Sequence, residues 1–208
     1  MLFRSRWVVA SRDVIDKLHA TPLKNKTLLA CYETFALTPD NQLIFDAGGQ
    51  PLLRSCGTGD APAVLVATGE IERFLRGGGR KVVFLNLDEL DREPDLTALL
   101  DAHDDAKKPI TCSVESSTHS PGRGVICNHQ GFDQAVEHHR LSFNGTNGQF
   151  TWRTGGVMIV DATALGEATF KWPWHRVRRI VGGKLMSHFE RSIYDLTSIY
   201  QTQFVNVQ

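Results

Sequence analysis

The stretch "CGTGDAPAVLVATGEIERFLRGGGRKVVFLNLDEL", residues 56–90, decides the fold class of this chain. It begins with a glycine-rich turn, continues through an amphipathic segment, and ends in a run of apolar and β-branched residues. A turn, a helix and a buried strand in this order are typical of an α/β sheet. We therefore predict a helix over 61–77 and a strand over 80–88.

The same alternation continues on both sides of this stretch. Before it, strand, helix and strand are predicted over 6–11, 12–21 and 27–33; after it, a helix is predicted over 95–106. Short strands separated by turns follow, then helical spacing over 183–200, and a last strand over 202–207. We predict an α/β fold with a mixed, mostly parallel sheet, in a single domain over 1–208 with a strand-rich part at about 109–160.

Charge and cysteine content exclude several classes of protein. Lysine plus arginine equals aspartate plus glutamate, at 23 each, so the overall charge does not favour a nucleic-acid or acidic-membrane partner. The four cysteines, Cys31, Cys56, Cys112 and Cys127, form no C-x-x-C pair, which argues against a zinc site or a disulfide framework. No segment is typical of a signal peptide or a membrane span, so we expect a cytoplasmic protein.

The glycine-rich turn is the first candidate site. Gly57 and Gly59 flank Thr58, Asp60 follows, and a helix begins near Pro62. Glycines let backbone amides approach a ligand, and a helix N-terminus attracts phosphate or carbonyl groups. The alternative is a plain strand-to-helix turn with Asp60 as the N-cap.

The second candidate site lies at the end of the strand over 80–88. In sheets of this kind, ligands bind beyond the carboxyl ends of the strands. Asp88 stands there, and a carboxylate in this position can hold a Mg²⁺ ion that neutralises a diphosphate, with help from Glu89 or Asp91. The alternative is that Asp88 or Asp91 caps the next helix.

A third candidate is "WPWHRVRRI", residues 172–180, in which arginines stand among aromatic residues. Arg178 and Arg179 belong to this group and could clamp phosphate oxygens with bidentate hydrogen bonds. The alternatives are a solvated basic face and a nucleic-acid patch.

The strand-rich part contains candidates for binding a sugar. Gly155 and Gly156 would let a sugar or base approach the backbone, although a β-bulge explains them equally well. Glu137 could accept hydrogen bonds from sugar hydroxyls, although an exposed strand glutamate is commoner. His138 and His139 point to opposite faces of a strand, so both cannot line one metal site.

Taken in order, these segments resemble the UDP-sugar pyrophosphorylases, meaning the UTP:glucose-1-phosphate uridylyltransferases and the UDP-N-acetylhexosamine pyrophosphorylases. The segment over 56–90 is similar to that family's "GHGD", helix and "VDN" strand; "GRGVICNHQGFDQAVEHHRL" is similar to "GVVC..DG...VVEYSE". "WRTGGVMIV" takes the place of "FNAGNI", "WPWHRVRRI" resembles "LPYHxAxKKI", and "FERSIYDLTS" resembles "EKFVFDIF". The evidence is the order of these segments over nearly the whole chain.

The resemblance implies a nucleotide-diphospho-sugar transferase fold, GT-A-like and reduced at its N-terminus. It implies a nucleotidyltransferase that moves a uridylyl group from UTP to a sugar-1-phosphate, aided by Mg²⁺ or Mn²⁺. The implied roles are nucleotide binding for Gly57, Thr58, Gly59 and Asp60, metal binding for Asp88, sugar binding for Gly124, Glu137 and Gly156, and phosphate binding for Arg178 and Arg179.

The chain also departs from the family pattern. The family opens with a strand and a "GGxGTRxG" loop around the triphosphate, whereas this sequence begins at what would be the second strand. "RGGGRK", over 76–81, has a similar composition but follows a helix, where a glycine C-cap explains it. We therefore expect a homo-oligomer or a partner chain that supplies the loop.

Two other functions stay open at this point. One is a catalytically inactive module that binds a nucleotide sugar or acts as a scaffold. The other is a GT-A-type glycosyltransferase that uses "DELD", residues 88–91, as its metal motif. Fold resemblance alone does not separate these functions.

Overall fold

The computed structural model describes residues 33–85, 95–116, 124–129, 131–137, 140–141, 151–167 and 171–206, and the backbone of 6–9 and 27–30. The chain divides into two compact units. Unit 1 comprises residues 1–65 and 172–193, and unit 2 comprises 66–171 and 194–208. The expectation of a single domain stays a prediction, and each unit is described by itself.

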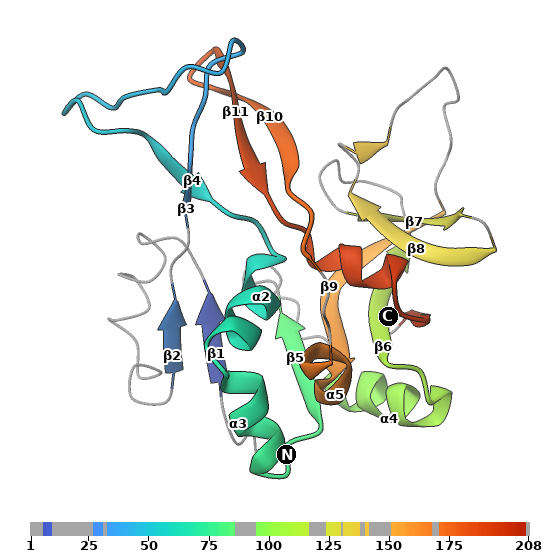
Figure 1. The fold of residues 1–208 in the computed structure, drawn as a ribbon. Helices are drawn as coiled ribbons and strands as arrows, with labels where there is room; N and C mark the ends of the chain where they lie inside the picture. Colours follow the sequence, from blue (N-terminus) through green and yellow to red (C-terminus); the bar gives the residue numbers. More distant parts are fainter. Residues whose placement is uncertain are drawn as a thin grey trace. The chain divides into compact units, whose positions relative to one another are not determined.

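Unit 1 consists mainly of paired strands. Its elements are β1 (Arg6–Val9), β2 (Thr27–Ala30), β3 (Glu33–Phe35), β4 (Leu53–Ser55), β10 (His175–Val181), β11 (Lys184–Glu190) and most of α2 (Asp60–Ala67). β1 and β2 are parallel, whereas β3–β4 and β10–β11 are antiparallel pairs. Figure 1 shows β10 and β11 as a long hairpin.

Unit 2 is built around a mixed six-stranded sheet. Its strands are β5 (Lys81–Leu85), β6 (Ile110–Ser116), β7 (Gly124–His129), β8 (Phe132–Glu137), β9 (Trp152–Asp161) and β12 (Thr202–Asn206). Its helices are α3 (Glu70–Arg76), α4 (Leu96–Ala106), α5 (Ala162–Gly166) and the 3₁₀ helix η4 (Ile193–Ser198), whose first residue belongs to unit 1.

The core of unit 2 lies between α4 and the sheet. Asp95 caps α4, because its side chain accepts a hydrogen bond of 2.9 Å from the backbone N–H of Ala98. Leu99 of α4 is buried against Val157 and Ile159 of β9. The helix predicted over 95–106 is therefore confirmed, and its apolar stripe covers the sheet.

The sheet direction differs in part from the prediction. β12 pairs with β6 in parallel, but β9 runs antiparallel to β5, β6 and β7, and β7 is antiparallel to β8. A mixed sheet is thus confirmed, whereas a mostly parallel one is not found among the described pairings. In the described part of the chain, no helix is long and apolar enough to cross a membrane.

Two predicted helices also differ. The helix expected over 61–77 is two helices, α2 and α3, because Gly69 between them adopts a left-handed φ of 73°. The helix indicated by the spacing of apolar residues over 183–200 is wrong, because these residues form β11 and η4. Gly182 and Gly183, both with positive φ, close the β10–β11 hairpin, and this pairing overrides the local helical pattern.

Candidate functional site

Close packing explains both glycines of the turn at Gly57–Asp60. Gly57 has a φ of +85°, and a Cβ on it would lie 2.4 Å from the backbone oxygen of Arg191. A Cβ on Gly59 would lie 2.7 Å from the backbone carbonyl carbon of Ser192. Both glycines are therefore needed because the chain at Glu190–Ser192 crosses directly against the turn.

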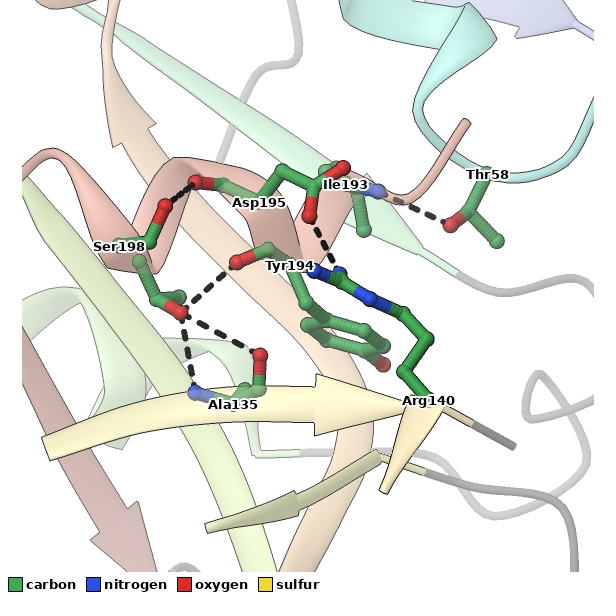
Figure 2. A network of polar contacts seen from close by, with 8 residues as sticks. Thr58, Ala135, Arg140, Ile193, Tyr194, Asp195 and Ser198 are labelled. Carbon is green, nitrogen blue, oxygen red and sulfur yellow. Dashed lines mark hydrogen bonds and ion pairs between the residues drawn. The ribbon is translucent and has the colours of Figure 1, made fainter. Parts of the chain in front are cut away.

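The backbone of the turn already has partners within unit 1. The N–H of Gly57 donates to the Ser55 hydroxyl at 3.2 Å, and the N–H of Gly59 donates to the Arg191 carbonyl at 2.9 Å. The Thr58 hydroxyl accepts a bond of 3.1 Å from the N–H of Ile193, which Figure 2 shows. Because the Thr58 oxygen is the acceptor in this bond, the proton of the same hydroxyl can be donated to a ligand.

Asp60 is the first residue of α2, and its buried carboxylate forms an ion pair with a partly exposed arginine. The side chain accepts from Arg191 Nη1 at 3.2 Å, and the guanidinium of Arg191 lies 4.1 Å from the Trp174 ring centroid. Oδ2 of Asp60 is buried and has no hydrogen-bond partner among the described residues. Burial raises the pKa of the Asp60 carboxyl, and the positive charge of Arg191 opposes the rise.

Arg178 and Arg179 point in opposite directions, because successive residues of a strand alternate between its two faces. Arg179 Nη2 donates to Glu190 Oε1 at 3.0 Å. A Cβ on Gly57 would lie 2.9 Å from Cβ of Glu190, so Glu190 links Arg179 to the turn. Of the two arginines, Arg179 therefore belongs on the side of Glu190 and the turn.

Gly124 and Glu137 of the predicted sugar group are neighbours in unit 2. They are directly paired across β7 and β8. A Cβ on Gly124 would lie 3.3 Å from Thr154 Cγ2 and 3.4 Å from the Tyr194 ring.

The third member, Gly156, belongs to a bulge of β9. The pairing of β6 with β9 shifts between Cys112 and Val114, and Gly156 has a φ of 83°. Ser113 spans the bulge, because its hydroxyl accepts from the N–H of Val157 at 3.1 Å. The β-bulge alternative for this glycine pair is confirmed.

Sequence patterns did not reveal a polar network around η4, drawn in Figure 2. Asp195, which is buried, accepts a bond of 2.5 Å from Arg140 Nη1. The Thr197 hydroxyl accepts from the N–H of Ala135 at 2.9 Å and donates to the carbonyl of Tyr194 at 2.7 Å. These contacts tie η4 to β8, the strand that carries Glu137.

The predicted metal ligand cannot be placed. Asp88, Glu89, Asp91, His138 and His139 lie outside the described residues. Among the residues that are described, no three His, Cys, Asp or Glu side chains form a group that could hold a metal ion. Cys56, Cys112 and Cys127 are free thiols, and burial raises the pKa of Cys112 and Cys127.

No protein-family model matches the sequence, and no curated protein matches it. Solved structures do match. A UDP-glucose phosphorylase from Trypanosoma brucei gives a TM-score of 0.77 over 97% of this chain and 49% of that one, at 14% identity. A UDP-glucose pyrophosphorylase variant from Leishmania major, in complex with UDP-glucose, gives 0.70 over 97% and 51%, at 13% identity.

A UDP-N-acetylglucosamine pyrophosphorylase from Trypanosoma brucei, in complex with an inhibitor, gives a TM-score of 0.66 over 97% of this chain and 47% of that one, at 12% identity. The chain has the fold of UDP-sugar pyrophosphorylases. The resemblance predicted from the order of the motifs is thus confirmed at the level of the fold. The chain spans about half the length of each of these three structures.

Proposed function

We propose that this chain binds a UDP-sugar or a sugar-1-phosphate and acts in uridylyl transfer between UTP and a sugar-1-phosphate. The observation that carries the proposal is the match of fold over 97% of the chain to a pyrophosphorylase in complex with UDP-glucose. Because fold alone does not fix function, the proposal depends on the residues that would touch the ligand.

At the nucleotide end, we assign binding to Gly57, Thr58, Gly59 and Asp60. Two polar groups of this turn support the assignment, namely the Thr58 hydroxyl proton and the unpartnered Oδ2 of Asp60. Oδ2 is a buried acceptor, which a ribose hydroxyl or a base N–H would satisfy only when the turn opens to admit it. The internal bonds of Gly57 and Gly59 favour the inactive-module alternative instead, so binding and turnover must be measured separately.

For the phosphate we assign Arg179 ahead of Arg178, which narrows the pair predicted from the sequence. Arg179 binds the Glu190 carboxylate at 3.0 Å, and its side chain is 59% exposed, so a phosphate oxygen could share or replace that partner. Positioning the α-phosphate for in-line attack and neutralising its charge are the chemistry this transfer requires.

At the sugar end, we assign Gly124, Glu137 and Gly156 in unit 2. The cross-strand pairing of Gly124 with Glu137 supports this assignment, because it places a carboxylate, which accepts hydrogen bonds from hydroxyl groups, directly beside the glycine.

Mg²⁺ or Mn²⁺ is proposed at Asp88, where it would neutralise phosphate charge during transfer. The test is titration calorimetry of UDP-glucose and UDP-N-acetylglucosamine with and without the metal, in the native chain and in Asp88→Ala. We expect metal to tighten binding in the native chain alone. For each nucleotide sugar, equal affinities with and without metal in both the native chain and Asp88→Ala would contradict the assignment.

The proposed function is tested by comparing two neighbouring arginines. Loss of one charge-assisted phosphate contact weakens binding by about 1.5 to 3 kcal/mol, roughly tenfold or more. We expect Arg179→Ala to weaken UDP-glucose by this amount and leave uridine unchanged, while the matched control Arg178→Ala changes neither. Equal effects on UDP-glucose and uridine would contradict a phosphate contact.

Turnover separates the remaining functions. A pyrophosphorylase exchanges labelled pyrophosphate into UTP from a nucleotide sugar, a glycosyltransferase releases UDP onto an acceptor, and an inactive module does neither. A partner chain with a glycine-rich loop stays a prediction. Turnover that appears only after such a chain is added would support it.

A further inference from the structure

Unit 1 contains a sheet face whose apolar side chains are exposed. A bridge between Leu37 and Ser187 joins the β3–β4 pair to the β10–β11 hairpin, through hydrogen bonds of 2.7 and 2.8 Å in both directions. Residues that are directly paired point to the same face, and the register therefore fixes which side chains share it.

The register places seven large apolar residues on this one face. Phe35 pairs with Leu53, Ile180 pairs with Leu185, and Leu37 pairs with both Ser187 and Leu43. We call this surface the apolar face; its members, all between 39% and 76% exposed, are Phe35, Leu43, Phe45, Leu53, Ile180, Leu185 and Phe189. The opposite face carries Ala36, Val177 and Met186, which are buried.

The exposed area is close to what a stable dimer needs. An aromatic side chain covers about 150–250 Å², so the three half-exposed phenylalanines leave about 300 Å², and the four aliphatic side chains leave about 200 Å² more. A standard interface buries about 800 Å² on each partner, and about 600 Å² is the upper end for the largest apolar patch of a typical monomer. The face is therefore large enough to form the centre of an interface.

The charges on the apolar face fit a second copy of the same chain. Arg178 lies there because its partner Ser187 does, and Glu33 lies there because it is two residues before Phe35. Neither side chain forms an ion pair with a described residue. Arg176, which pairs with Phe189, also lies on this face, so the face carries charges of both signs beside its apolar side chains. A two-fold axis can place the cations of one copy against the anion of the other.

We propose that two copies of this chain associate through the apolar face. The dimer buries Phe35, Ile180 and their neighbours, and it brings Arg178 of one copy toward the acidic side chain at position 33 of the other. The inference does not depend on the proposed function, because Arg178 serves there only as the control and none of the residues assigned to the ligand is used.

The test is the mass of the full chain, measured by sedimentation and light scattering over a range of concentrations. The native chain should have twice its monomer mass of 23.2 kDa. Phe35→Glu and Ile180→Glu should each weaken the dimer at least 100-fold. Phe132→Glu is the matched control, because Phe132 is 59% exposed but lies on β8 of unit 2.

Circular dichroism shows whether each variant is folded, and a charge exchange provides a test that spares the apolar residues. Arg178→Glu should weaken the dimer, and adding Glu33→Arg should restore it. An ordinary dimer has a Kd of about 1 μM, so a chain concentration of about 100 μM is about 100 times that Kd. A native chain that is still monomeric at about 100 μM overturns the proposal. Disruption of the dimer by Phe132→Glu overturns the proposal as well. So does a dimer that persists in folded Phe35→Glu and Ile180→Glu variants.

Discussion

Asp60 shows how a single residue of the candidate site is fixed by partners far along the chain. The sequence predicted an acidic group after two glycines, but its cation, Arg191, is 131 residues away. The close approach of Glu190–Ser192 to Gly57 and Gly59 is equally remote in sequence. Local patterns therefore identified these residues as candidates for a site. They could not show that close packing accounts for the two glycines and an ion pair for Asp60.

The raised pKa of Asp60 predicts the pH dependence of stability. The ordinary pKa of this carboxyl is 3.8, and burial raises it in the folded chain. The folded state thus holds the proton more tightly than the unfolded state does, which adds to the free energy of unfolding at low pH. This contribution is complete below the pKa of the unfolded state, and it is lost as pH rises through the pKa of the folded state. We expect Asp60→Asn to gain free energy of unfolding relative to the native chain between pH 4 and pH 7, in denaturant titrations. A difference that moves the other way would show that attraction to Arg191 outweighs burial.

At the scale of elements, local patterns predicted most of the strands and helices but not all their pairings. The strands around β6, β7, β8 and β9 were expected from short apolar runs between turns. The β11 strand was not, because apolar residues over 183–200 also fit helical spacing and the Gly182–Gly183 turn was not recognised. Strand direction depends on which distant strands meet, which no local pattern contains.

The connection between η4 and β8 gives the prediction at this scale. The Thr197 hydroxyl satisfies the backbone N–H of Ala135, which is buried. Thr197→Val keeps the shape but leaves this N–H unsatisfied, which costs about 1–3 kcal/mol. We expect this loss in denaturant titrations, together with faster hydrogen exchange at Ala135. The control is Thr197→Ser, which retains the hydroxyl; equal destabilisation by both substitutions would show that the methyl group, and not the hydrogen bond, matters.

For the whole molecule, the order of weak motifs predicted the fold better than any single motif did. Matches over 97% of the chain to UDP-sugar pyrophosphorylases agree with that order. The order could not predict that the candidate residues divide between two compact units. The nucleotide group and Arg179 belong to unit 1, whereas Gly124, Glu137 and Gly156 belong to unit 2.

This division leads to a prediction for the complete chain. If the assigned groups bind their ligands, uridine monophosphate should slow hydrogen exchange in unit 1, around the Gly57–Asp60 turn and β11. Glucose-1-phosphate should slow it in unit 2, at β7 and β8, because a ligand suppresses the local opening of the segments it contacts. Exchange measured peptide by peptide, with inorganic phosphate as the control for anion binding, distinguishes the two patterns. Protection of unit 2 by uridine monophosphate, or protection of unit 2 by inorganic phosphate equal to that by glucose-1-phosphate, would show that the assignment of nucleotide and sugar groups to separate units is wrong.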